Sequence, residues 1–154
     1  MKVRQARLDR ILGVYKPECR YLKETELIHP RFMHGRFEIP SSAYIENIGH
    51  LNATELFICY NQLAYAFLDE RSLIQDEVSC QDMDISELRE MQLHKCLICS
   101  ADKIRFNREI DSRSFEGHIE VKNIRLNKGN TFYKTSYYFG DGAATGDILL
   151  VKLH

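Results

Sequence analysis

One segment restricts the possible folds of this chain more than any other, because it predicts a helix that is apolar on almost every side. Asn52 followed three residues later by Glu55 resembles a capping box, with Asn in place of the usual Ser or Thr. From Leu56 to Leu68 the residues are apolar nearly all round the helical wheel. A helix at a protein surface keeps a polar face, so we expect the helix at about 52–68 to be buried on most sides.

The rest of the chain reads mainly as short strands. Ahead of the long helix, periodicity predicts a helix at 5–14 and strands at 21–28, 32–39 and 43–48. After it, Asp84 with Glu87 predicts a short capped helix to about Gln92. Five strands are then expected, at 93–100, 104–110, 115–126, 131–139 and 147–153. A change of the apolar face predicts a β-bulge near Lys122 and Asn123, and Gly129 suits a hairpin turn.

A long buried helix and a run of antiparallel strands fit together when the sheet curls around the helix. This is the hot-dog fold, of class α+β. We expect one hot-dog domain over residues 1–154, with 1–14 as an N-terminal helical extension, since 154 residues suit one domain. Hot-dog domains generally pair their sheets, so fold analogy predicts a homodimer or higher homo-oligomer with sites at the boundary between protomers.

Charge and hydropathy exclude several classes of function. The chain has 21 Lys and Arg against 22 Asp and Glu, a net charge of −1, so it lacks the basic excess that nucleic-acid binding needs. No apolar run reaches the length of a membrane span. The basic start is not followed by an apolar stretch, so it does not read as a secretory signal, and we expect a cytoplasmic protein.

The five cysteines predict free thiols rather than disulfides or a metal site. An odd count without an export signal is typical of a reducing compartment. Cys96 and Cys99 form a CxxC pattern, but residues three apart on a strand point to opposite faces. A structural zinc site also needs four ligands, so we expect no metal. Cys59, inside an apolar run, is most simply a small core residue.

Several polar residues around the buried helix have both a structural and a functional interpretation. His50 is either a loop residue or an acid/base near the helix start, and Glu55 is either the third residue of the cap or a catalytic base. Asn61 lies in the middle of the apolar helix, so either the core supplies a hydrogen bond or a pocket meets the helix there. The glycine-rich segment 140–146 lacks a P-loop ending and reads as a turn between strands that can border a substrate channel.

The central part of the sequence resembles a known family. The resemblance covers most of the chain, from about Tyr15 to the C-terminus, and is to the FcoT-type long-chain fatty acyl thioesterases of mycobacteria and their actinobacterial relatives. Its most specific motifs are Ser42-Ala43-Tyr44-Ile45, Gly49-His50-Leu51-Asn52-Ala53, Glu55-Leu56 and Cys59-Tyr60-Asn61-Gln62-Leu63-Ala64-Tyr65, with looser matches at Phe106-Asn107-Arg108 and Gly142-Ala143-Ala144-Thr145-Gly146.

The resemblance implies a hot-dog fold with an active site built from tyrosines and asparagines. Carried over residue by residue, the catalytic set is Tyr15, Tyr44, Asn52 and Asn61. Asn52 and Asn61 are nine residues apart, which is 2.5 helical turns and therefore opposite faces of one helix. They can serve one site only if Asn52 lies off the helical wheel as a cap, or if two protomers combine.

The implied substrate is a fatty acyl thioester, carried on coenzyme A or on the phosphopantetheine of an acyl carrier protein, with no other cofactor. Hydrolysis is the default reaction of the family. The alternative, in isonitrile lipopeptide pathways, adds glycine to the β-carbon of a (2E)-enoyl thioester on the carrier protein. Both reactions build negative charge on the thioester oxygen, which backbone N–H groups, an Asn side chain and a Tyr hydroxyl would bind.

The nucleophile separates these alternatives. Hydrolysis needs a positioned base, and the matched set contains no carboxylate, so it depends on His50 or Glu55, or proceeds slowly through hydrogen bonds alone. Glycine addition instead needs a cation for the glycine carboxylate or the carrier phosphate, and the candidates are Arg20, Lys95, Arg105 and Arg108. Two further alternatives stay open: dehydration of a 3-hydroxyacyl thioester by His50 with Glu55, and a non-catalytic module that binds acyl chains.

Overall fold

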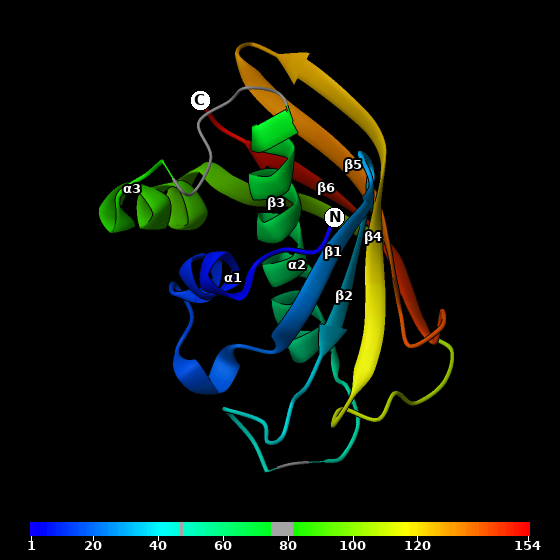
Figure 1. The fold of residues 1–154 in the computed structure, drawn as a ribbon. Helices are drawn as coiled ribbons and strands as arrows, with labels where there is room; N and C mark the ends of the chain where they lie inside the picture. Colours follow the sequence, from blue (N-terminus) through cyan, green and yellow to red (C-terminus); the bar gives the residue numbers. More distant parts are fainter. Residues whose placement is uncertain (47, 75–81) are drawn as a thin grey trace.

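The computed structural model describes residues 1–46, 48–74 and 82–154. A six-stranded antiparallel sheet curls around one long helix, α2 (Ala53–Ile74), as Figure 1 shows. The strand order is β1-β2-β4-β5-β6-β3. The strands are β1 (Leu22–His29), β2 (Phe32–Phe37), β3 (Cys96–Phe106), β4 (Phe115–Asn127), β5 (Asn130–Phe139) and β6 (Ala144–Lys152).

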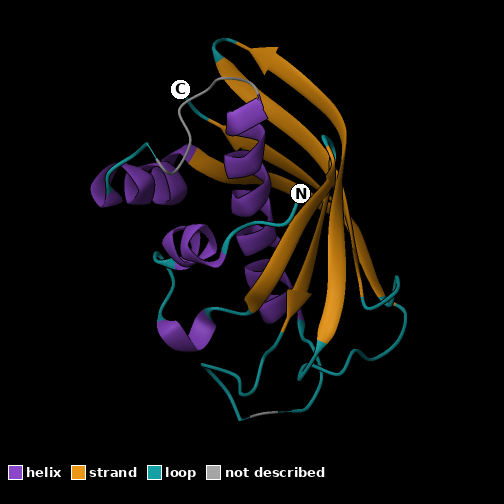
Figure 2. Ribbon diagram, viewed as in Figure 1, coloured by secondary structure: helices purple, strands orange, loops and turns teal. Residues whose placement is uncertain are grey.

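The smaller helices lie on the side of α2 that faces away from the sheet (Figure 2). They are α1 (Gln5–Leu12), a 3₁₀ turn at Pro17–Cys19, α3 (Ile85–Glu90) and a π-helical turn at Met91–Lys95 that leads into β3. The side chain of Asp84 caps α3 in the predicted capping box with Glu87. Helix α2 is therefore enclosed by the sheet on one side and by short helices on the other, as its apolar sequence predicts.

Aromatic contacts join α2 to the inner face of the sheet. Tyr60 and Phe67 on the helix pack against Tyr137 and Tyr133 on β5, with ring centroids 6.0 and 6.4 Å apart. All four side chains are buried, and the hydroxyl of Tyr60 lies 2.7 Å from the hydroxyl of Thr135. The buried polar atom is thus paired inside the core, where an unpaired one would cost about 1–3 kcal/mol.

The long helix continues six residues beyond the predicted end at 68. Asp69 and Glu70 lie in this extension with almost no exposed surface, and buried Arg7 of α1 forms ion pairs with both carboxylates. The predicted N-terminal extension is helical only over α1, because residue 2 instead forms an antiparallel bridge to Glu26 of β1. This start of the chain packs on α2 and the sheet and is part of the core.

Two of the predicted strand boundaries are wrong. Residues 43–46 and 48 form no strand; they belong to an exposed loop, which ends at Gly49 with a φ of +80° that only glycine adopts easily. The strands expected at 93–100 and 104–110 are one strand, β3, because the polar residues between them form an irregularity with Lys103 at a φ of 53°. The bulge between Val121 and Asn123 and the turn at Gly129 are confirmed.

The cysteines follow the predicted alternation where they are described. Cys96 is buried and Cys99 is exposed, so the two thiols lie on opposite faces of β3, and Cys59 is buried in the core. Cys80, together with most of the acidic connection that begins at residue 75, lies outside the described residues. Across residues 1–46, 48–74 and 82–154, no cluster of His, Cys, Asp and Glu is placed to hold a metal ion. None of the helices in these ranges combines the length and apolar character that a membrane crossing needs.

Candidate functional site

The start of α2 holds a network centred on the amide of Asn52. Its Oδ1 accepts hydrogen bonds from the Glu55 backbone N–H, at 3.0 Å, and from the Tyr44 hydroxyl, at 2.6 Å. These two donors hold Oδ1 toward the helix, so Nδ2 of the same amide points away from the Glu55 N–H and the Tyr44 hydroxyl. Nδ2 is buried and has no hydrogen-bond partner among the described residues. Asn52 thus caps the helix with its oxygen and keeps an unused donor on its nitrogen.

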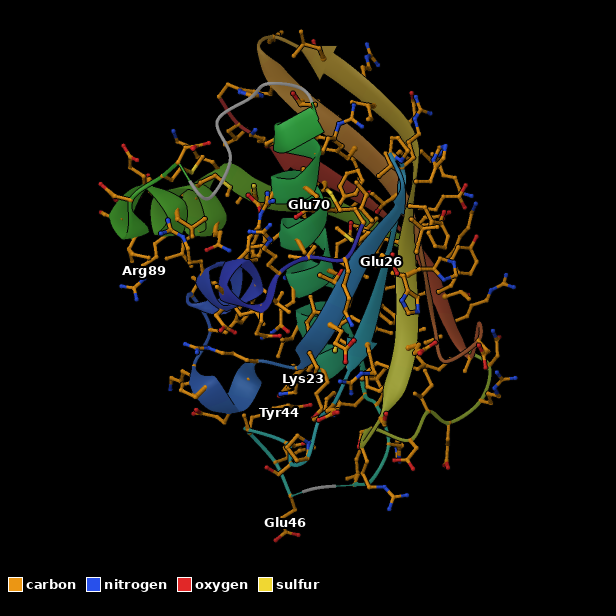
Figure 3. The ribbon with its side chains drawn as sticks, in the orientation of Figure 1. Lys23, Glu26, Tyr44, Glu46, Glu70 and Arg89 are labelled. Carbon is orange, nitrogen blue, oxygen red and sulfur yellow. The ribbon has the colours of Figure 1, made fainter. Side chains whose placement is uncertain are left out.

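Tyr44 reaches this network from the loop that precedes the helix. Figure 3 shows Tyr44 in the loop beneath the start of α2, with Glu46 further from the helix. The Tyr44 ring is 48% exposed, so its hydroxyl bond to Asn52 lies at the surface of the site. The sequence prediction that Tyr44 and Asn52 act together is consistent with this contact, but the hydroxyl proton points at the Asn52 oxygen.

Glu55 is buried and has a hydrogen-bond partner that the capping-box pattern does not predict. Its carboxylate is buried and accepts a hydrogen bond from the hydroxyl of Ser42, where the full capping box would have used the backbone N–H of Asn52. Only the Asn52 half of the box is therefore present. The hydrogen bond from Ser42 to Glu55 joins the loop to the helix at a position two residues before Tyr44.

A surface depression opens beside the same end of α2. It is lined by His50, Leu51, Asn52, Ala53, Phe106, Arg108 and Glu109. The backbone here is held like a strand, because Leu51 N–H donates to the Ile110 carbonyl at 2.9 Å and His50 forms an antiparallel bridge to Asp111. The loop before α2 and the loop after β3 thus meet at one end of the sheet, which is the lower end in Figure 1.

Arg108 is fixed by the glycine-rich turn between β5 and β6. One terminal nitrogen of its guanidinium donates to the carbonyls of Gly140 and Asp141, at 2.9 and 3.1 Å. Gly140, Asp141 and Gly142 all have positive φ, a backbone that aligns their carbonyls outward at the turn. Asn107 adds a side-chain bond to the Gly142 carbonyl at 3.2 Å. The glycine-rich turn at 140–146 therefore positions Arg108 at the depression.

The other two matched residues lie further along α2. Asn61 is half-buried and forms no hydrogen bond within the described part of the chain. Tyr15 packs against Tyr65, one turn beyond Asn61, with ring centroids 6.5 Å apart. Burial, with smaller effects from Tyr65 and Cys59, raises the pKa of Tyr15 far above its usual range, so its hydroxyl stays protonated.

The four matched residues therefore form two groups in one protomer. Tyr44 and Asn52 are bonded to each other at the helix start, whereas Tyr15 and Asn61 lie on the flank of α2 that is not covered by the sheet. Nine residues of helix separate the two asparagines by about 13 Å along the axis. Of the two geometric alternatives from the sequence, the structure shows the first, since Asn52 is a cap; that two protomers combine in one site stays a prediction.

The four candidate cations are also separated. Arg20 donates from Nε to the Tyr15 carbonyl at 3.1 Å, and Lys95 is exposed at the opposite end of β3 from Arg108. Arg105 pairs with Thr145 on the sheet and lines a different depression on the outer face. Arg108 is the candidate that shares a depression with Asn52 and His50.

The sequence pattern assigns no role to two polar residues, Gln62 and Glu109. Gln62, fully buried, accepts from the backbone N–H groups of Tyr21 and Leu22 and donates to the Cys19 carbonyl. The core hydrogen bonds expected near Asn61 thus belong to its neighbour. Glu109 lines the depression beside Asn52. Its position directly after the Phe106-Asn107-Arg108 match is the sequence feature that could have marked it as a site residue.

Comparisons with known proteins agree with this architecture. Residues 10–151 match the family model described as an FcoT-like thioesterase domain. A (2E)-enoyl-ACP glycyltransferase of Streptomyces coeruleorubidus is 32% identical, over 78% of this chain and 74% of that protein. A protein of the same name from Mycobacterium marinum is 29% identical, over 96% of this chain and 85% of its own length.

Solved structures show the same fold at much lower identity. The dehydratase heterocomplex ApeI:P of Xenorhabdus doucetiae includes a chain that superposes with a TM-score of 0.63 at 9% identity, covering 98% of this chain and 93% of that one. A hypothetical thioesterase of Streptococcus pneumoniae, solved with coenzyme A, gives a TM-score of 0.51 at 6% identity, with 96% of each chain covered. The predicted hot-dog fold is therefore confirmed.

Proposed function

This chain belongs to the FcoT-like thioesterase family, and from that premise we propose that it adds glycine to the β-carbon of a (2E)-enoyl thioester on an acyl carrier protein. Enzymes that act on acyl thioesters are the common ground of the family model and the curated relatives, and the relatives carry the name of this specific reaction. The observation that carries the proposal is the amide of Asn52, whose N–H donor has no partner among the described residues and lies beside a depression that also holds His50 and Arg108.

Asn52 would stabilise the charge that forms on the thioester oxygen. Its Oδ1 is already held by Tyr44 and by the Glu55 N–H, so Nδ2 cannot rotate away from an incoming carbonyl. One preorganised donor of this kind is worth about 3–4 kcal/mol of activation barrier. Protein atoms cover Nδ2 in this structure, so the proposal requires that the bound thioester displace one of the groups that cover it. In this proposal Tyr44 is a positioning residue for Asn52.

The addition balances with one proton carrier, for which we propose His50. The imidazole takes a proton from the glycine ammonium, and the free amine forms a bond to the β-carbon. The π electrons of the alkene move onto the thioester oxygen, giving an enolate that Asn52 binds. Proton return from the imidazolium to the α-carbon restores the carbonyl. His50 lines the same depression as Asn52, and an imidazole can both accept and return a proton. No cofactor beyond the carrier's phosphopantetheine takes part.

Hydrolysis and dehydration would both need the Glu55 carboxylate to act as a base or to partner His50. As the base for water, or as the partner of His50, its carboxylate would have to face the depression, but it is buried and bound to the Ser42 hydroxyl. An amine nucleophile needs less activation than water, so the arrangement favours glycine addition. Hydrolysis is the second candidate, since it is the activity for which the family is described.

We also propose that the active form is a dimer joined along β3. This 11-residue strand is an edge of the sheet, and its exposed apolar side chains are Leu97, Ile98, Ile104 and Phe106. Long apolar edges of this kind pair with another strand. A second copy joined there in antiparallel fashion would extend the sheet across two protomers.

The test is direct product analysis on purified protein. A (2E)-enoyl acyl carrier protein is incubated with and without glycine, and the carrier is weighed by intact-protein mass spectrometry. We expect a gain of one glycine that is absent with a saturated acyl chain. Release of free acid at equal rates with and without glycine would overturn the proposal in favour of hydrolysis, and binding without turnover would favour an acyl-binding module.

Asn52→Asp is the informative variant, because Asp keeps the capping oxygen and removes the N–H donor. We expect a fall in kcat of about 100-fold or more with little change in stability. Thr54→Ala, at the exposed first turn of the same helix, is the matched control.

A further inference from the structure

We propose that Arg108, Glu109 and His50 form a subsite for a free zwitterionic amino acid at the mouth of the Asn52 depression. The inference rests on the proposed glycine addition and names the residues that would hold the second substrate. All three residues line one depression with Asn52. A guanidinium and a carboxylate at one depression complement the carboxylate and ammonium groups of an amino acid.

Arg108 suits the carboxylate because its own anchoring leaves part of its fork unused. One terminal nitrogen is taken by the carbonyls of Gly140 and Asp141. Its Nε and its other terminal nitrogen make no hydrogen bond or ion pair within the described residues. A guanidinium presents donors in a rigid planar arrangement that matches a carboxylate, so these two nitrogens can bind both of its oxygens.

The glycine-rich turn explains why this arginine is held in place. Three consecutive residues with positive φ, from Gly140 to Gly142, expose carbonyls that accept from Arg108 and from Asn107. Carbonyl acceptors hold a guanidinium without neutralising it. Arg113, in the same loop, shows the contrast, because it is bound bidentately by Asp111, whose pKa it lowers to about 2.

Glu109 and His50 supply the groups that face the amine. Among the described residues, neither side chain has a hydrogen-bond or ion-pair partner. The Glu109 carboxylate attracts the ammonium group, and the adjacent imidazole removes its proton for the addition. The product is a secondary amine that still carries the carboxylate on Arg108, so the subsite binds the new group until the carrier leaves.

The experiment separates the nucleophile from the acyl carrier. Kinetic constants for glycine and for the enoyl carrier protein are measured in wild-type protein, Arg108→Gln, Arg108→Lys and Glu109→Gln. A matched control is Arg125→Gln, an exposed arginine on the strand β4. We expect Arg108→Gln to raise the KM for glycine about 10- to 100-fold, with the KM for the carrier unchanged. Arg108→Lys keeps the charge but loses the planar fork, so it should recover only part of the loss.

Glycinamide tests whether the carboxylate is the group recognised. Wild-type protein should prefer glycine over glycinamide, and Arg108→Gln should remove this preference while using glycinamide as well as wild type does. An unchanged KM for glycine in Arg108→Gln would overturn the subsite, as would an equal rise in Arg105→Gln. Saturation-transfer NMR of free glycine measures binding without turnover. If wild-type protein forms no adduct but binds glycine, and Arg108→Gln loses that binding, the subsite is still supported. If wild-type protein does not bind glycine, the subsite is refuted.

Discussion

Two neighbouring amides of α2 should differ sharply in what they contribute to stability. Gln62 is fully buried and binds the Tyr21 and Leu22 N–H groups at 3.0 and 2.8 Å. Gln62→Ala leaves both N–H groups buried without a partner, at about 1–2 kcal/mol each, so we expect a loss of about 2–4 kcal/mol. Asn61→Ala removes a half-buried amide without a partner in the described structure and should cost about 0.5 kcal/mol or less.

Urea unfolding followed by circular dichroism measures the difference, provided that both variants keep the wild-type m value. In thermal unfolding the loss in Gln62→Ala corresponds to roughly 10 °C in Tm. Gln62→Met separates hydrogen bonding from packing, because Met fills most of the volume and accepts only weakly. We expect Met to restore less than half of the loss. Equal losses in the Ala variants, or full rescue by Met, would refute the reasoning.

Three other predictions follow from packing and charge. Burial raises the pKa of Glu70, so its protonated form favours the folded state and stability is lost as pH rises above about 4.5; Glu70→Gln should lose less stability than wild type over this rise in pH, measured by urea unfolding. A Cβ on Gly117 would lie 1.9 Å from the Phe139 ring, so Gly117→Ala should lower the free energy of unfolding by about 1–3 kcal/mol, whereas Gly129→Asn at an open turn should be mild. Ile98→Lys on β3 should give monomers in light scattering if β3 is the dimer interface.

Sequence alone predicts the elements that local patterns control. The apolar helix, the Asn52 cap, the Asp84 capping box and the β4 bulge all follow from the spacing of a few residues. The strand expected at 43–48 is absent from the described residues 43–46 and 48, which pair with no neighbouring strand. Pairing with a partner strand, which no local pattern reveals, decides whether such a segment becomes sheet.

The site could be predicted only as far as residue types go. Four cations stood as equal candidates, and what separates them is the tertiary contact of Arg108 with carbonyls more than 30 residues later in the chain. Likewise, Asn61 and Gln62 are neighbours in a helix, and only the packing of the Cys19–Leu22 segment shows that Gln62 carries the core hydrogen bonds. Long-range placement, rather than chemistry, is the information that the sequence pattern lacks.

In the function that we propose, the cap of α2 would serve both folding and chemistry. A Ser or Asp at this position would cap the helix as well, because capping uses only an oxygen acceptor. Asn adds an N–H donor on the opposite side, and the same two bonds that satisfy its oxygen hold that donor in one orientation. In the proposed reaction, the bonds that cap the helix would therefore also supply the preorganisation that an oxyanion donor needs, without a separate structural element.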